Sequence, residues 1–225
     1  ELHEVGLLVA LVPEFEAITG RVPHDAYHTY TADVHALLSV DRLRSIVRGE
    51  LATEFPVVSR CAAELPRPLP LYMATLLSEL GAGHPESPAG HAATLAGPIC
   101  KRLGLSAADV KHVQWLIEQQ SSLYHWALRR DISDPDTIAE IAREVQTIDR
   151  LRDLYLLTFC CVSTANPTAM TAWNARMLLE LWISVSDVIE GRRVSSEYVA
   201  GLHEQVLSLA VDVSEQKLLA AFLSE

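Results

Sequence analysis

Hydrophobic and polar residues follow the helical period along most of this chain. Between residues 25 and 49, Leu37, Val40, Leu43 and Val47 recur at spacings of three and four, which places them on one face of a helix. Few segments show the period-two alternation that is typical of strands. The pattern therefore predicts an all-α protein.

Proline, glycine and capping residues divide this pattern into roughly ten helices. Ser106 with Asp109 resembles a capping box, with Asp in the place of Glu. Asp134-Pro135 places a capping residue before a proline at the first helical position, and Gly191 is a natural helix stop. We expect helices at about residues 1–19 (interrupted near Pro13), 25–49, 53–65, 69–80, 92–103, 106–120, 134–146, 149–163, 167–190, 195–210 and 214–223.

The composition suits a helical core and argues against several classes of partner. The chain has 225 residues, of which 49% are hydrophobic, and a formal charge of −11. Because no basic run is longer than two residues, as at Arg129-Arg130 and Arg192-Arg193, we expect no nucleic-acid partner. No apolar run reaches membrane-spanning length and no signal peptide is evident, so we expect a cytoplasmic protein without a membrane partner.

The cysteines and the first residue add two smaller expectations. None of Cys61, Cys100, Cys160 and Cys161 forms a C-x-x-C motif, so we expect free thiols in a reducing cytosol. The chain begins at Glu1 rather than at an initiator Met, so we interpret it as a domain of something longer or as a processed chain.

Histidine spacing alone does not establish a metal site. His24 and His28 are four residues apart, and His28 and His35 are seven apart, so each pair could share a helix face. Two or three histidines on one helix are nevertheless more often surface or core residues than ligands.

Two other sequence patterns bear on phosphate chemistry. Gly81-Ala82-Gly83 is not followed by Lys and Ser or Thr, so it is not a P-loop, and no G-x-S-x-G elbow is present. Arg129, Arg130 and Asp131 could contact a phosphate or another ligand, because guanidinium groups match phosphate oxygens. We favour the alternative, a structural ion pair that anchors the loop before Asp134.

Several blocks of sequence resemble the HD domain of PII uridylyltransferase/uridylyl-removing enzymes. They keep their order from about residue 5 to 185, and 129–135 is the most distinctive. The other blocks are 24–35, 71–77, 100–105, 115–117, 154–158, Asn166-Pro167 and Trp173-Asn174. The resemblance implies an HD-like helical bundle at 1–190, in degenerate form. It also implies a C-terminal helical extension at 191–225 that could lead to regulatory modules.

In the family that the chain resembles, this domain removes uridylyl groups from the PII protein by metal-assisted hydrolysis. The divalent ion lowers the pKa of its bound water and stabilises charge on the phosphoryl oxygens. The resemblance implies that its first ligand is His28, but all six other ligand positions are changed. The His-Asp pair is replaced by Ser78-Glu79, the next histidine by Pro88, the paired histidines by Gln119-Gln120, and the late aspartate by Cys161.

We therefore expect a vestigial pocket with no catalytic residue, no metal and no cofactor. Its expected members are His28, Ser78, Glu79, Gln119, Gln120 and Cys161. The preferred function is an inactive HD-like domain with a regulatory, scaffolding or protein-binding role. The resemblance implies a PII-like or other regulatory protein as partner, and the long amphipathic helices allow a homodimer.

Two alternatives remain open from the sequence. One is a phosphohydrolase whose metal site is rebuilt from neighbouring side chains, and a mixed Cys/His set would suit zinc. Its candidate ligands are His84, His91, His125 and Cys161. The other is a small-molecule sensor that uses the vacated pocket, with Arg130 beside the polar residues already named.

Overall fold

The computed structural model describes residues 3, 5–22, 29–166 and 168–191, which form ten α-helices, two 3₁₀ helices and no strand. The prediction of an all-α protein is confirmed, and the bundle agrees with an HD-like fold. The elements are α1 (Leu7–Leu11), η1 (Pro13–Ile18), α2 (Ala32–Val47), α3 (Pro56–Ala63), α4 (Leu69–Leu77), η2 (Ser78–Gly81), α5 (Pro88–Arg102), α6 (Ala107–Glu118), α7 (Ser122–Arg129), α8 (Pro135–Val145), α9 (Ile148–Ala165) and α10 (Ala172–Ile189).

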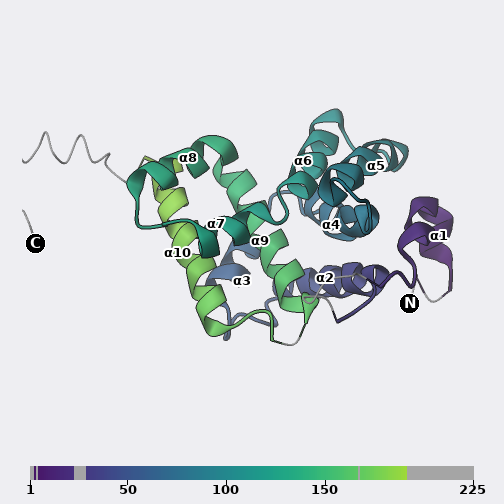
Figure 1. Cartoon of the computed structure of the whole chain (residues 1–225), viewed down its shortest axis with the longest axis horizontal. Helices are drawn as coiled ribbons and strands as arrows, with labels where there is room; N and C mark the ends of the chain where they lie inside the picture. Colours follow the sequence, from purple (N-terminus) through teal and green to yellow (C-terminus); the bar gives the residue numbers. More distant parts are fainter. Residues whose placement is uncertain (1–2, 4, 23–28, 167, 192–225) are drawn as a thin grey trace, which may run out of the picture.

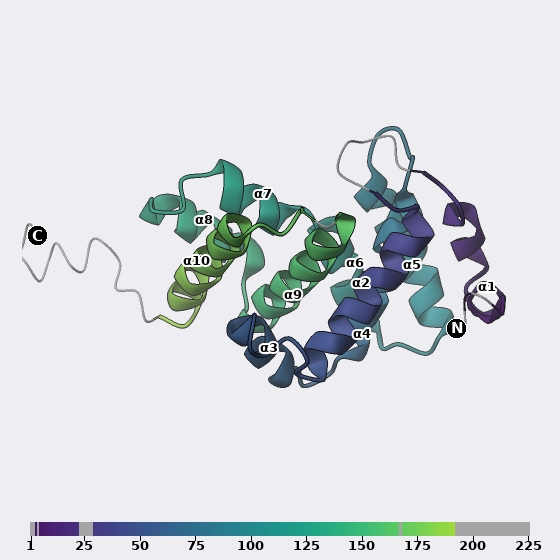
Figure 2. The ribbon, with the colours of Figure 1, turned by 90° about the horizontal axis from the view of Figure 1, so that it is seen from below.

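Helix α9 is the central element of the bundle. All ten residues from 151 to 160 are buried, so no face of this stretch is open to solvent. One side of α9 packs on α2, α4 and α6, and the other on α7, α8 and α10 (Figures 1 and 2). A helix that is buried on every side must satisfy its polar side chains within the protein. This requirement applies to both sites described below.

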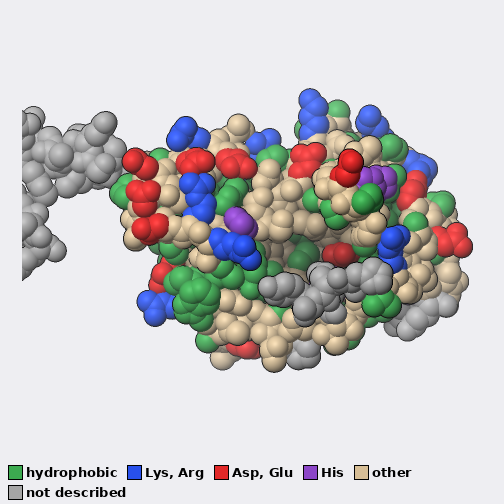
Figure 3. Space-filling view, viewed as in Figure 1, with side chains coloured by type: hydrophobic (Ala, Val, Ile, Leu, Met, Phe, Trp, Pro, Cys, Tyr) green, Lys and Arg blue, Asp and Glu red, His purple; other side chains and the backbone are tan. Residues whose placement is uncertain are grey.

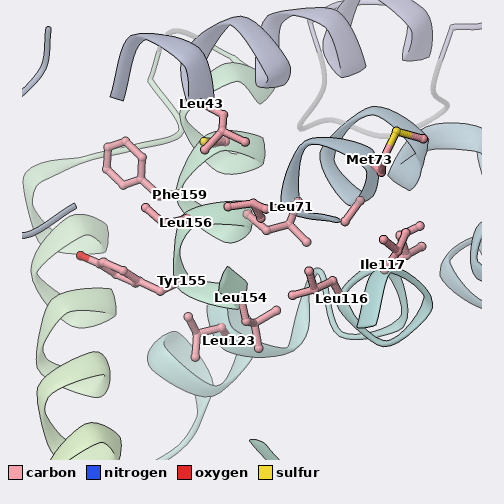
Figure 4. Close-up of a cluster of buried hydrophobic side chains, with 14 of the residues drawn as sticks. Leu43, Leu71, Met73, Leu116, Ile117, Leu123, Leu154, Tyr155, Leu156 and Phe159 are labelled. Atoms are coloured by element: carbon pink, nitrogen blue, oxygen red, sulfur yellow. The ribbon is translucent and has the colours of Figure 1, made fainter. Parts of the chain in front are cut away.

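Apolar side chains from five helices meet around α9 (Figure 4). The residues at the centre of this core are each at most 1% exposed to solvent. These members include Leu43 of α2, Leu71 of α4, Leu116 of α6, Leu123 of α7, and Leu154 and Phe159 of α9. The core therefore holds α2, α4, α6 and α9 in one fixed arrangement.

The structure confirms the helix ends that were predicted from capping residues. Ser106 Oγ accepts a hydrogen bond from the backbone N–H of Asp109 at 3.1 Å, and α6 begins at the next residue. The Asp134 side chain accepts from the N–H groups of Asp136 and Thr137, and α8 begins at Pro135. Gly191 follows α10 with a φ of 67°, the left-handed conformation that favours glycine after a helix.

Other predicted boundaries were wrong. The helix expected at 25–49 begins only at Ala32, because Thr31 is extended (φ −66°, ψ 156°). The helix expected at 69–80 ends at Leu77 and continues as η2. Helix α7 was not predicted, and α10 begins at Ala172 rather than at 167. The helices expected at 195–210 and 214–223, with the extension from 192 onward, lie outside the described residues.

The structure bears on the state of the cysteines and on membrane-spanning helices. All four cysteines are free; three are buried and Cys161 is partly buried. None of the helices that the structure describes is long and apolar enough to span a bilayer.

Candidate functional site

Three of the predicted vestigial positions, Ser78, Glu79 and Cys161, lie where α2, η2 and α9 meet. Ser78 and Glu79 open η2 at the end of α4, and Cys161 lies three turns into α9. Between them lies His35, whose side chain is 3% exposed. His35 Nδ1 is 3.0 Å from Glu79 Oε1, and His35 Nε2 is 2.9 Å from the carbonyl oxygen of Cys161. One imidazole thus joins three elements that are distant in sequence.

The partners of His35 determine how many protons the cluster holds. The Cys161 carbonyl can only accept, so His35 Nε2 carries a proton and donates it. The contact between Nδ1 and Glu79 needs a second proton, held either by the imidazole or by the carboxyl group. In both cases the His35–Glu79 pair is neutral overall. A metal ligand, in contrast, must offer a free lone pair from a neutral imidazole.

The thiol of Cys161 is held in its protonated form. Burial is the largest cause and raises its pKa to about 12, and the nearby Glu79 carboxyl group adds to this rise. Hydrogen bonds with Ser39 and Ser78 act in the opposite direction but do not overcome burial. Because zinc and other soft metals bind the thiolate, Cys161 is a poor ligand in this environment.

Hydroxyl groups close the remaining sides of the cluster. Ser39 Oγ lies 2.8 Å from Thr164 Oγ1, and Thr164 donates to the carbonyl of Cys160 at 2.8 Å, which leaves Ser39 as the donor of the first bond. Ser78 Oγ donates to the carbonyl of Thr75 at 3.1 Å. These neutral groups satisfy one another, as a polar cluster in a helical core requires.

The two glutamines lie at the junction of α6 and α7, against α9. Thr158 Oγ1 donates to the carbonyl of Gln120 at 3.4 Å, one turn before Cys161 on α9. The side-chain oxygen of Gln119 is buried without a hydrogen-bond partner. A buried orphan acceptor is uncommon in a folded protein, and this oxygen keeps its capacity to accept a hydrogen bond.

Pro88 lies beside the cluster through a close contact of two backbones. Pro88 opens α5, and an added Cβ on Gly81 would stand 1.8 Å from the Pro88 carbonyl oxygen. Only glycine fits at position 81, which is two residues after Glu79. The start of α5 therefore packs directly against η2. The structure therefore brings Pro88 near the cluster, where it offers no ligand atom in its side chain.

Sequence reasoning missed the central histidine. His28, the predicted member, lies outside the described residues, and its assignment stays a prediction. His35 was noted only for its spacing from His28, yet it makes the contacts with Glu79 and Cys161. The available signal was its position on α2, one turn before Ser39, in a helix whose inner face also carries Leu43.

The histidines proposed for a rebuilt metal site do not form a ligand set in the described part of the chain. The rings of His84 and His91 stack in parallel, with centroids 4.5 Å apart and planes 14° apart, so their nitrogens do not converge. His125 is exposed on α7. Among the residues that the structure describes, no three His, Cys, Asp or Glu side chains are placed to hold a metal ion.

The segment Arg129 to Asp131 makes local contacts at the surface. Arg130 Nη2 lies 2.5 Å from Glu140 Oε2, and Asp131 Oδ1 accepts from both the backbone N–H and the hydroxyl of Ser133. Figure 3 shows acidic side chains gathered over α8 and a hollow between the two sides of the bundle. These contacts agree with a structural ion pair, and a phosphate contact stays a prediction.

Comparison with curated proteins identifies the relatives of the chain. It is 36% identical over 196 residues to the bifunctional uridylyltransferase/uridylyl-removing enzyme of Gluconobacter oxydans, which is 87% of this chain and 21% of that protein. The proteins of the same name from Zymomonas mobilis and Thiobacillus denitrificans are 33% and 32% identical over 96% and 91% of the chain. The chain is a homologue of one region of these enzymes.

The resemblance inferred from sequence blocks is thereby confirmed, and the helical bundle is consistent with an HD-domain region of that enzyme. The chain spans about a fifth of the length of these curated relatives, namely 21%, 23% and 24%. No protein-family model matches it. The activity of the whole relatives is therefore a matter for proposal.

Proposed function

We propose that this chain is a catalytically inactive HD-like domain that serves a regulatory, scaffolding or protein-binding role. The observation that carries the proposal is the contact of His35 with Glu79 and with the Cys161 carbonyl. Both ring nitrogens are engaged with partners inside the bundle. The only carboxylate among the predicted ligand positions is engaged by the same ring.

The physical argument concerns charge. Metal-assisted hydrolysis needs anionic and neutral donors that together hold a divalent cation. Here the His35–Glu79 pair is already neutral with its shared proton, and the Cys161 thiol is protonated because burial raises its pKa to about 12. A cation would have to displace these protons, so this arrangement supports an inert pocket.

The proposed partner is a PII-like or other regulatory protein, as the resemblance implies. The curated relatives carry the words uridylyl-removing in their names. A domain that keeps their fold could keep a surface that such a protein contacts while the chemistry is lost. Titration of a labelled PII-like protein with this chain tests this part, and absence of saturable binding would contradict it.

Metal content and hydrolysis test the inactivity. We expect the purified chain to hold far less than one equivalent of Mn, Fe or Zn, and to release no uridylyl group from a uridylylated PII protein. The corresponding region of the Gluconobacter oxydans relative, prepared in the same way, is the positive control. Stoichiometric metal that is lost in a His35→Ala variant but kept in His125→Ala would overturn the proposal.

A small-molecule sensor is the second candidate, and the orphan oxygen of Gln119 favours it. A ligand that donates to this oxygen would bind only the folded state and raise the melting temperature. A thermal-shift screen with nucleotides, glutamine and 2-oxoglutarate is the test. A true hit should disappear in Gln119→Leu, whereas a hit that survives this change would argue against the pocket.

A further inference from the structure

A second polar site lies at the opposite ends of the helices that frame the vestigial cluster. A pocket of about 390 Å³ opens beside the first residues of α4, α6 and α9. Its walls are Pro66, Arg67, Pro70, Ala108, Lys111, His112, Thr147, Asp149, Arg150, Arg152 and Asp153. On α9 alone, twelve residues separate Asp149 from Cys161, which is about 18 Å of helix. The two sites are therefore distinct.

Positive charge is concentrated in this pocket. The chain carries a formal charge of −11, yet four of its 18 Lys and Arg residues, Arg67, Lys111, Arg150 and Arg152, line the pocket. The N-terminal turns of three helices also face it, and helix N-termini carry partial positive charge and free N–H groups. The basic side chains come from three separate segments: Arg67 precedes α4, Lys111 lies on α6, and Arg150 and Arg152 lie on α9.

The floor of the pocket is buried and not fully satisfied. Arg152 and Asp153 are 8% and 6% exposed. Arg152 Nε and Asp153 Oδ1 stand 3.4 Å apart, and neither atom has a hydrogen-bond partner. The two atoms are held only by this long ion pair, so the buried Nε–H of Arg152 has no hydrogen-bond acceptor within the chain.

The acidic residues of the pocket are already engaged by bases. Asp153 Oδ2 lies 2.7 Å from His112 Nε2, and Asp149 Oδ1 lies 2.8 Å from Arg152 Nη2. Arg67 pairs with Asp109 at 2.6 Å at the rim, where the Arg67 side chain is 67% exposed. An exposed pair of this kind contributes little to stability, so an incoming anion can take over the guanidinium group.

Aromatic stacking holds the basic groups in place. The His112 ring lies parallel to Trp115, 6.2 Å away and at 11°, and the guanidinium of Arg150 lies over Trp115 at 4.9 Å. Arg150 also donates to Gln146 at 2.7 Å. The pocket thus presents preorganised cations, which lowers the entropic cost of binding.

We propose that this pocket binds a phosphate-bearing small molecule with two linked phosphoryl groups, such as a nucleoside diphosphate or a free diphosphate. Guanidinium forks and helix N-termini are the groups that recognise phosphate oxygens. A pocket of about 390 Å³ whose bases come from three segments has room for more than one phosphoryl group. This inference does not depend on the proposed function, because it uses none of the vestigial residues.

Inorganic pyrophosphate is the probe, titrated by calorimetry against the full chain at constant ionic strength. We expect one saturable site, with weaker binding of inorganic phosphate and weaker still of sulfate. Because each charge-assisted contact contributes roughly tenfold in affinity, Arg67→Gln with Lys111→Gln should weaken binding about tenfold or more. Both side chains are exposed, so the fold should persist. The matched control, Arg44→Gln with Arg176→Gln, removes two exposed bases elsewhere and should change binding less than about twofold.

Backbone amide shifts locate the site independently. Pyrophosphate should move the resonances of Thr147 and Arg150 and leave those of Glu79 and Gln119 unchanged. Equal binding of sulfate, equal loss in the control variant, or shifts confined to Glu79 and Gln119 would each overturn the proposal. A free nucleoside diphosphate that competes with pyrophosphate would support it, and one that fails to compete would restrict the site to the inorganic ion.

Discussion

Replacing Glu79 tests whether its contact with His35 is a structural hydrogen bond that carries a shared proton. Glu79→Gln keeps the shape and lets the amide donate to a neutral His35, whose Nε2 still donates to Cys161. Glu79→Met keeps the length but removes the carboxylate partner of Nδ1 in a ring that is 3% exposed. The two variants therefore differ by one hydrogen bond and little volume.

The expected magnitudes follow from burial. Leaving a buried polar atom unpartnered costs about 1–3 kcal/mol. Since the Glu79 side chain is 16% exposed, water reaches the rim of the cluster, and we expect about 1–2 kcal/mol for Glu79→Met, in the lower part of that range. For Glu79→Gln we expect less than about 0.5 kcal/mol, because the bond is kept. In a chain of this size the Met variant should melt roughly 2–8 °C lower.

Urea unfolding followed by circular dichroism measures both variants under one set of conditions. A changed midpoint with an unchanged slope would show that stability, and not the compactness of either state, has changed. If Glu79→Met and Glu79→Gln were equally stable, the His35 contact would contribute nothing, and the argument for a proton-filled pocket would fail.

Four further outcomes follow from the structure. Phe159→Ala in the fully packed core should lower stability by about 3–5 kcal/mol in urea unfolding, and a loss under 1 kcal/mol would contradict the packing. Ser106→Ala removes the cap on the Asp109 N–H and should cost about 1 kcal/mol, whereas an unchanged midpoint would argue against that cap. Cys161 should resist iodoacetamide at neutral pH in the folded chain and react after unfolding, because its pKa is raised to about 12. Burial raises the pKa of Asp33, but hydrogen bonds from Thr31, Gly20 and Val34 outweigh burial and lower this pKa below 3.8. The stabilising effect of Asp33 should therefore be full above pH 3.8 and disappear as the pH falls through the lowered pKa. Asp33→Asn should flatten this part of the acid-unfolding curve.

Prediction from sequence succeeded where local chemistry decides the structure. The Ser106 and Asp134 caps and the Gly191 stop were all read from single residues, because each satisfies or ends a helix by its own side chain or φ angle. The break at Thr31 and the change from α4 to η2 were missed. No residue there forbids a helix, and tertiary packing selects the backbone.

The candidate site also contains residues that the sequence predicted and one that it missed. Ser78, Glu79 and Cys161 could be named from motif order, since homologous positions keep their place along the chain. His35 was overlooked because nothing in its neighbours shows that its ring reaches residues 44 and 126 positions away. Contacts across such separations depend on how helices pack, which a periodic pattern does not encode.

The amino-acid order alone determined that the chain is helical, acidic and related to uridylyl-removing enzymes, because periodicity, charge and motif order are properties of the chain itself. Only the folded bundle decided that α9 is enclosed, that Glu79 contacts His35, and that four basic side chains line one pocket. The reason is geometric: helix packing brings together side chains from distant segments, and burial then determines which of them stay charged.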